Sequence, residues 1–201
     1  MKRYLLLGFF VLNTSIILSQ KSSLNAGFDL LGLKDQTPYG AGFRLGYEFA
    51  IPKINFFTLE ARISAGKLMN DGLYQVEPNL KEWCCDASYF RVGVCPRFYY
   101  RMANDIDLFL DPEIGVARLS GETYFSEQKK WNQTKTFDTY YYSIRIGLAV
   151  PLTDKLKLSL AFGYSSLDIT NMMNSKLSTI NYRFKSQAVD FDTAFTLHVI
   201  L

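Results

Sequence analysis

Large apolar side chains alternate with small or polar ones along most of the chain. Residues 156–164, Leu-Lys-Leu-Ser-Leu-Ala-Phe-Gly-Tyr, give the clearest example, because every second position is large and apolar. Successive side chains of a strand point to opposite faces, so this segment predicts a ribbon with one apolar and one polar face. Eight such ribbons are predicted, over residues 24–33, 41–51, 56–67, 88–102, 106–119, 140–152, 156–164 and 188–201.

The connections between these ribbons alternate in length. Residues 52–55, 103–105 and 153–155 are short enough for hairpin turns. The other connections run over residues 34–40, 68–87, 120–139 and 165–187, and three of them are long. Short turns at one end, long loops at the other and an even strand number are typical of outer-membrane barrels. The predicted fold class is all-β, an eight-stranded antiparallel up-and-down transmembrane β-barrel.

A soluble barrel of lipocalin type would show similar alternation, with its apolar face turned inward around a ligand. The composition of the second face separates the two architectures. Here that face carries the charged residues together with glycines at positions 42, 46, 66, 93, 115, 147 and 163. Small residues beside long Arg and Glu side chains suit a crowded polar lumen. The apolar face is free of charge in the middle of the strands. Since a charge there would cost about 2–4 kcal/mol at the bilayer midplane, we expect that face to meet lipid.

Aromatic residues gather near both ends of the predicted strands. Near the short turns lie Tyr47, Phe49, Phe57, Phe98 and Tyr100, and near the long loops lie Phe90, Tyr142 and Tyr164. Two such bands are typical of the girdles at membrane–water interfaces.

The N-terminus indicates export. Lys2 and Arg3 precede a short apolar run over residues 4–12, and the small residue Ser19 follows. This pattern predicts a cleaved signal peptide over residues 1–20, followed by the barrel over residues 21–201, and an uncleaved anchor helix is the alternative. Cleavage leaves 20 basic against 19 acidic residues, so the net charge falls from +3 to +1. That balance gives no reason to expect a nucleic-acid partner.

In this arrangement of strands, turns and girdles the chain resembles the small eight-stranded outer-membrane proteins, the superfamily of the OmpA transmembrane domain, OmpX and the opacity-type adhesins. Similar proteins end in an aromatic residue, whereas the last strand here ends Leu197-His198-Val199-Ile200-Leu201. The resemblance is architectural and covers nearly all of the exported chain. It implies residence in the outer membrane of a Gram-negative bacterium, in contact with its lipid and as a monomer, with a porin-like barrel.

The inward-facing charges are the main candidate site. We expect them to form a structural polar network in the lumen, because buried charges persist only when paired and hydrogen-bonded. Its predicted members are Arg44, Glu48, Glu60, Arg62, Arg97, Arg101, Asp107, Asp111, Glu113 and Arg145. A hairpin centred on Asn104 sets Arg97 against Asp111, Arg101 against Asp107 and Cys95 against Glu113. The same register opposes Pro96 to Pro112, which predicts a local bulge or a slipped register, since neither residue can donate to the ladder.

Catalysis has little support in the sequence. The single histidine, His198, faces inward, and only Ser143, Ser159 or Asp190 could complete a nucleophilic arrangement around it. No phosphate-binding glycine loop or His/Cys cluster occurs, so we expect no cofactor and no metal. The three cysteines, Cys84, Cys85 and Cys95, permit at most one disulfide.

The predicted function is therefore non-enzymatic: a structural or surface-interaction role of adhesion type, carried by the long extracellular loops. Those loops contain Trp83, Trp131, Lys129, Lys130, Tyr124, Phe125, Met172 and Met173, a mixture suited to cell-surface protein or glycan ligands. A narrow channel and a lipid-modifying enzyme of the outer membrane are the alternatives.

Overall fold

The structure is a computed structural model that describes residues 21–33, 39–76, 79–102, 105–126, 129–174 and 189–201. The predicted signal peptide over residues 1–20 lies outside these described residues. The strands are β1 (Ser23–Leu33), β2 (Tyr39–Ala50), β3 (Phe57–Val76), β4 (Asn79–Arg101), β5 (Asp107–Phe125), β6 (Lys130–Gln133), β7 (Phe137–Thr153), β8 (Leu156–Ser165) and β9 (Val189–Ile200), with a short helix, α2 (Thr170–Asn174). Across the described ranges, no helix has both the length and the apolar content to cross a membrane.

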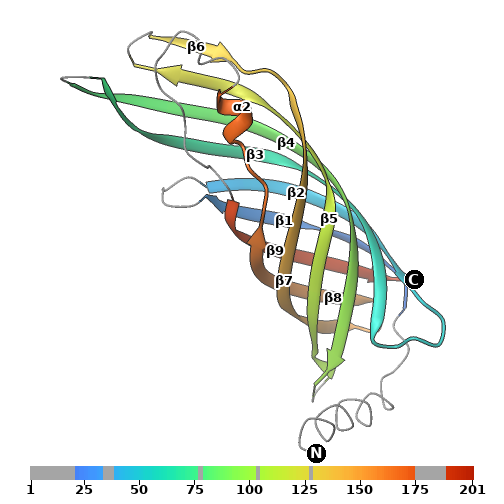
Figure 1. Cartoon of the computed structure of the whole chain (residues 1–201). Helices are drawn as coiled ribbons and strands as arrows, with labels where there is room; N and C mark the ends of the chain where they lie inside the picture. Colours follow the sequence, from blue (N-terminus) through green and yellow to red (C-terminus); the bar gives the residue numbers. More distant parts are fainter. Residues whose placement is uncertain (1–20, 34–38, 77–78, 103–104, 127–128, 175–188) are drawn as a thin grey trace, which may run out of the picture.

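Eight of these strands close into an antiparallel ring (Figure 1). Strand β1 pairs with β2 along one edge and with β9 along the other. The ring continues from β2 through β3, β4, β5, β7 and β8 to β9. Strand β6 pairs with the far end of β5 and stands outside the ring. The predicted eight-stranded up-and-down barrel is confirmed.

The alternation in the sequence sorts the side chains into an outward and an inward set. On β7 the outward Ile144 and Ile146 are 51% and 55% exposed, whereas Arg145 between them is fully buried. The other ring strands repeat this contrast, with outward residues such as Phe28, Phe43, Leu45, Ile63, Val92, Leu110, Leu158 and Phe195. We call these outward apolar residues of the ring the apolar band. An apolar outer belt around a polar interior is the distribution found in transmembrane barrels.

The three predicted hairpin turns lie together at one end of the barrel, here called the short-turn end. They join β2 to β3, β4 to β5 and β7 to β8. Two turn residues, Lys53 and Asp105, have φ values of 69° and 60°, the left-handed conformation that tight turns require. The β1–β9 pairing of Ser23 with Ile200 brings both ends of the barrel chain to this same end.

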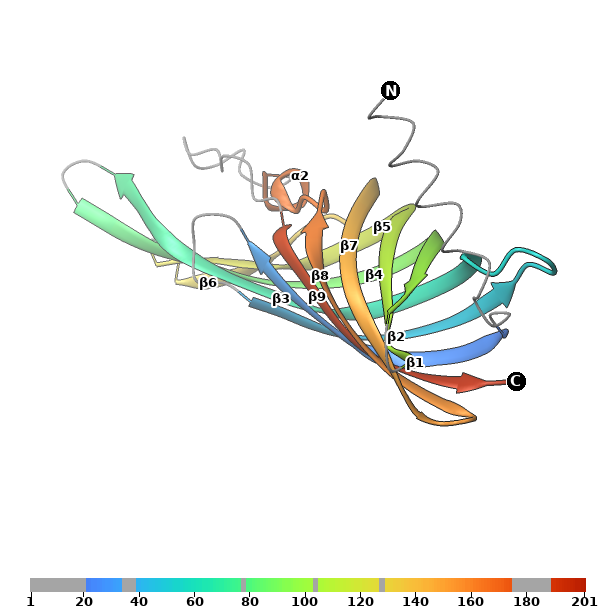
Figure 2. The same ribbon diagram turned by 90° about the horizontal axis from the view of Figure 1, so that it is seen from below.

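The long connections predicted over residues 68–87 and 120–139 are largely strand, so this part of the prediction is wrong. Strand β3 continues to Val76, β4 begins at Asn79 and β5 continues to Phe125. We call residues 68–76, 79–88 and 119–125 together with β6 the extension. Figure 2 shows the hairpin of β3 and β4 projecting well beyond the ends of β1, β2 and β9, as it also does in Figure 1. Outward residues of the extension include the polar Asp86, Ser88 and Glu122, so the apolar alternation that marks the other strands is interrupted here.

The hairpin of β4 and β5 has the predicted register. Arg101 pairs with Asp107, and the pairs Val94 with Ile114 and Phe98 with Leu110 lie on either side of the two prolines. All three pairs share one register, so the expected slip or bulge at Pro96 and Pro112 does not occur. The ladder is instead interrupted between those pairs, because neither proline has a backbone N–H to donate.

Candidate functional site

The inward face inside the apolar band is a cluster of charged side chains, which we call the lumen network. All ten residues predicted for it face the interior. Nine are at most 3% exposed, and Arg101, at the short-turn end, is half-buried. The buried nine are Arg44, Glu48, Glu60, Arg62, Arg97, Asp107, Asp111, Glu113 and Arg145.

The centre of the network balances three guanidinium groups against three carboxylates. Arg62 lies 2.5 Å from Glu113 and 2.9 Å from Glu60, measured from guanidinium nitrogen to carboxylate oxygen. Arg97 lies 2.8 Å from Glu60 and 3.0 Å from Asp111. Arg145 lies 3.3 Å from Asp111 and also contacts Glu113. Each ion therefore has at least two oppositely charged neighbours, the condition under which charges can be buried.

Two glycines make room for these carboxylates. A Cβ atom on Gly46 would lie 2.3 Å from Glu60 Oε1, and one on Gly93 would lie 2.8 Å from Glu113 Oε1. Larger residues at either position would displace an acid of the central cluster. The glycines on the inward face therefore follow from the crowding of ions within a narrow ring.

A second group of ion pairs lies nearer the long-loop end, the end opposite the short turns. Asp29 accepts from Arg91 at 2.7 Å and lies 3.3 Å from Arg44. Asp192 lies 3.3 Å from Arg145. The predicted network omitted Asp29, Arg91 and Asp192. Their alternation placed them on the inward face, but two of these contacts cross the lumen between strands that do not pair, and hairpin register gives no distance for such contacts.

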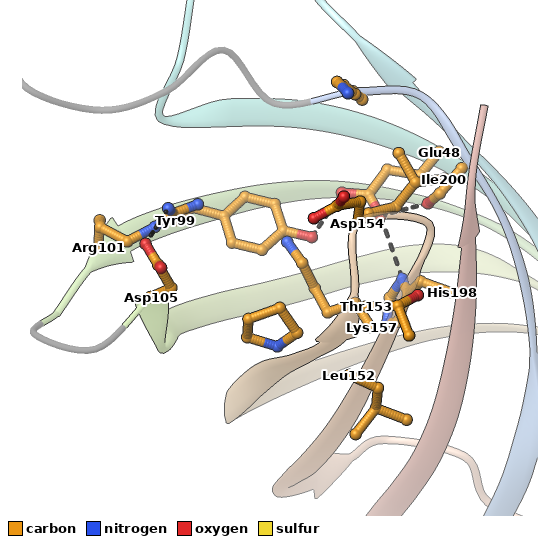
Figure 3. Close-up of a pocket in the computed structure, with 13 residues that line it drawn as sticks. Glu48, Tyr99, Arg101, Asp105, Leu152, Thr153, Asp154, Lys157, His198 and Ile200 are labelled. Carbon is orange, nitrogen blue, oxygen red and sulfur yellow. Dashed lines mark hydrogen bonds and ion pairs between the residues drawn. The ribbon is translucent and has the colours of Figure 1, made fainter.

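The short-turn end of the lumen opens into a cavity of about 420 Å³. Figure 3 shows Glu48, Tyr99, Lys157 and His198 around it. Glu48 accepts hydrogen bonds of 2.6 Å from both the Thr58 and the Tyr99 hydroxyl groups.

A second carboxylate, Asp107, is buried behind the cavity wall and contacts two of the cations that line the cavity. Its oxygens lie 2.8 Å from Lys157 Nζ and 2.5 Å from Arg101 Nε. The cavity wall therefore carries charges of both signs.

His198 lies between a hydroxyl group and a carboxylate. Its Nε2 atom is 2.8 Å from the Ser159 hydroxyl oxygen, and its Nδ1 atom is 3.5 Å from Glu48 Oε2. Of the partners considered from the sequence, the structure thus brings Ser159 to the histidine. Glu48 and His198 line the cavity but Ser159 does not, so the hydroxyl group lies behind the wall.

Beyond the lumen network, the inward positions of the same strands become apolar. Leu68, Tyr89 and Leu119 pack with Met172 and Met173 of α2. We call this buried group the cap cluster, and its members are Leu31, Leu68, Trp83, Cys85, Ala87, Tyr89, Ala117, Leu119, Phe125, Tyr141, Leu167, Ile169, Met172, Met173 and Val189. It closes the long-loop end of the barrel interior. Burial raises the pKa of the Cys85 thiol to about 12, and all three cysteines are free.

The cap cluster corrects the expectation that the long connections offer their aromatic and methionine side chains for recognition. Trp83, Phe125, Met172 and Met173 are at most 2% exposed and serve as core. Of the remaining residues in that set, Tyr124 is half-buried, whereas Lys129, Lys130 and Trp131 are exposed. The sequence pattern was ambiguous here, because apolar residues in a connection can bind a partner or pack under it.

Solved structures with the same architecture include the Neisserial surface protein A (NspA), with a TM-score of 0.52 and 10% identity over 92% of this chain and 99% of that chain. The outer membrane protein OprG from Pseudomonas aeruginosa gives a TM-score of 0.50 and 8% identity over 92% of this chain and 95% of that chain. No protein-family model and no curated protein sequence matches the chain. At these identities the likeness shows the fold alone, which is that of a small outer-membrane barrel, as the resemblance implied.

Proposed function

We propose that the chain is a monomeric, non-enzymatic protein of the bacterial outer membrane whose role is carried by the extension. A signal peptide over residues 1–20 is cleaved on export, the apolar band lies in the bilayer, and the extension stands outside the cell. This orientation follows the general rule that short turns face the periplasm and long segments face outward. The single observation that carries the proposal is the filled interior, in which the lumen network and the cap cluster lie one above the other.

The filled interior argues against a channel. Ions and water need a continuous polar path, but the guanidinium groups of Arg62, Arg97 and Arg145 reach into the lumen to carboxylates on strands with which their own strands do not pair. Above them the cap cluster offers an apolar barrier, which ions cross only at high cost. Planar-bilayer recording of the purified protein tests this point. We expect no stable conductance steps, and a steady conductance at neutral pH would overturn the closed barrel.

The enzymatic alternative has one observation in its favour, the chain from Ser159 through His198 to Glu48. Nucleophilic catalysis also needs an accessible hydroxyl group and donors for an oxyanion. Ser159 is 4% exposed and pairs with Ala149 on one side and Thr196 on the other, so its backbone is committed to the sheet. We therefore assign a structural role to the arrangement of Ser159, His198 and Glu48.

Two measurements test that assignment. A fluorophosphonate probe should fail to label Ser159 in the folded protein, and incubation with lipid A should leave its acylation unchanged by mass spectrometry. Labelling that is lost in the Ser159→Ala variant, or a change in acyl chains, would support the enzyme instead.

A further inference from the structure

A polar pocket of about 520 Å³ lies on the outward face of the extension. Its wall includes Lys67, Asp86, Ser88, Ser120, Glu122 and Gln133, which come from strands β3 to β6. We call it the rim pocket. Ser88 pairs with Lys67 and with Ser120, so these three side chains form one row across the sheet. Glu122 pairs with Asp86 and with Gln133 and forms the next row.

The rim pocket lies just above the apolar band. On β4 the outward Phe90 is 48% exposed and belongs to the band, and the next outward residue is Ser88. A strand rises about 3.3 Å per residue, so Ser88 lies about 7 Å beyond Phe90 on the same face. With the apolar band in a bilayer, this face of the pocket is at the height of the lipid headgroups rather than in bulk water.

The side chains of the pocket suit a sugar better than an anion. Lys67 Nζ lies 3.1 Å from Asp86 Oδ2, and this ion pair leaves Glu122 as the remaining charge. A phosphate group would meet an acidic surplus, so phosphate is not the favoured contact. Hydroxyl, amide and carboxylate groups at close spacing can instead donate to and accept from the hydroxyl groups of a saccharide.

An aromatic pair adjoins the pocket on the same face. Tyr124 pairs with Trp131 one row above Glu122 and Gln133, and the two ring centroids are 5.5 Å apart. Trp131 is 47% exposed. Exposed rings beside polar groups provide an apolar surface for the C–H face of a sugar ring while its hydroxyl groups bind the neighbouring polar side chains.

We propose that the rim pocket binds a sugar residue in the headgroup of a glycolipid of the outer leaflet. The inference rests on the proposed placement in the outer membrane, because only that placement brings a lipid headgroup to this height. A free glycan has the same chemistry, but the position beside the apolar band favours a sugar that the membrane itself presents. Attachment to the bilayer also raises the local concentration of the ligand, so modest contacts suffice.

The test uses the full exported protein in nanodiscs of phosphatidylcholine, alone or mixed with lipopolysaccharide purified from the producing bacterium. Tryptophan emission of the wild type is compared with that of a Trp131→Phe variant, so that the difference reports Trp131 and the buried Trp83 cancels. We expect a blue shift of the Trp131 signal with lipopolysaccharide and none with phosphatidylcholine.

The variants locate the site. Glu122→Gln combined with Gln133→Ala should weaken the titration by about tenfold, the loss expected when one hydrogen bond to the ligand loses its charge and another is removed. Lys155→Ala, in an exposed turn at the short-turn end, serves as the control and should leave the titration unchanged. An equal shift with phosphatidylcholine alone, or no shift with lipopolysaccharide, would overturn the sugar site.

The origin of the sugar and the membrane placement are tested separately. Core oligosaccharide released from the lipid should bind about tenfold more weakly than intact lipopolysaccharide, because it lacks the tether. Equal affinity would overturn the assignment to a glycolipid and indicate a free glycan. Failure of the protein to insert into phosphatidylcholine nanodiscs would instead count against the proposed function as a whole.

Discussion

Strands β4 and β5 bury ions at one height and apolar side chains at another. Inside the apolar band their inward positions hold Arg97 and Glu113, and in the extension the inward positions hold Trp83, Leu119 and Phe125. The ions are stable there because each has partners across a narrow ring. The apolar residues are stable because the extension and α2 together remove them from water. The described inward faces of these strands are thus charged where neighbouring and opposite strands supply counter-charges.

The two regions meet at Arg91. Its guanidinium carbon lies 5.0 Å from the ring centroid of Tyr89 and 5.4 Å from that of Tyr141, while its nitrogen contacts Asp29. The aromatic faces of the cap cluster therefore accept the last cation of the lumen network. Tyr141 also donates a 2.5 Å hydrogen bond to Glu113, so the junction is bonded from both sides.

The largest effect is expected in the lumen network. Replacing Arg145 by Met should lower the free energy of unfolding by about 3–5 kcal/mol, because it leaves Asp111, Glu113 and Asp192 without a shared counter-charge in a buried site. Urea unfolding of the refolded protein in lipid vesicles measures this. Arg118→Met, at an exposed ion pair, is the matched control and should have little effect. An Arg145→Met variant as stable as the wild type would mean that the buried carboxylates do not need the positive charge of Arg145.

A smaller loss is expected in the cap cluster. Leu119→Ala should lower the free energy of unfolding by about 2–4 kcal/mol, because a fully buried side chain is replaced by a cavity. Leu110→Ala on the same strand is the control, since Leu110 faces outward and is 44% exposed. Equal losses at the two positions would contradict a packed cap cluster above the lumen.

The two adjacent cysteines report whether the cap cluster is closed in solution. Burial raises the pKa of both thiols, but Cys84 is half-buried on the outward face whereas Cys85 is buried in the cap cluster. Only the thiolate reacts, so maleimide should modify Cys85 at least about tenfold more slowly than Cys84 at pH 8. Mass spectrometry of tryptic peptides from single-cysteine variants gives the two rates. Rapid modification of Cys85 in the folded protein would indicate an open cap.

The smallest effect is expected at the exposed surface next to the extension, where Arg118 Nε lies 2.8 Å from Asp138 Oδ1. This hydrogen bond holds the pKa of the Asp138 carboxyl below its usual 3.8. Since the pKa is lower in the folded state, the stabilisation is present above about pH 4 and is lost as the pH falls through the folded value. Asp138→Asn should therefore differ from the wild type slightly at pH 7, less at high salt, and less again as the pH falls through the folded pKa. A difference in stability that grows toward low pH would show that folding does not lower the pKa of Asp138.

Much of the barrel could be predicted from the sequence because alternation has a strict period of two. Ile144, Arg145 and Ile146 are enough to orient β7, and the turn centred on Asn104 is enough to pair Arg101 with Asp107. The same period identified the ten inward charges. These features depend on local chemistry, which the sequence contains.

The parts that the sequence did not reveal depend on contacts between distant segments. Asp29 and Arg91 are 62 positions apart, and no hairpin joins their strands. The extension has polar outward residues such as Asp86 and Glu122, so its strands do not show the apolar alternation used to find the others. Trp83 and Met172 are buried because α2 folds over the extension, and a single residue's hydrophobicity does not distinguish a core position from a binding position.

The central claim is that the outward residues of β7 face lipid while Arg145 faces a filled interior. Nitroxide labels at positions 142, 144, 146 and 148, in a protein whose three cysteines are replaced, test it by power-saturation measurements in lipid vesicles. We predict high accessibility to oxygen and low accessibility to a water-soluble nickel complex at all four positions, with the deepest label at position 146. Ready access of the nickel complex to labels 144 and 146 would contradict the account.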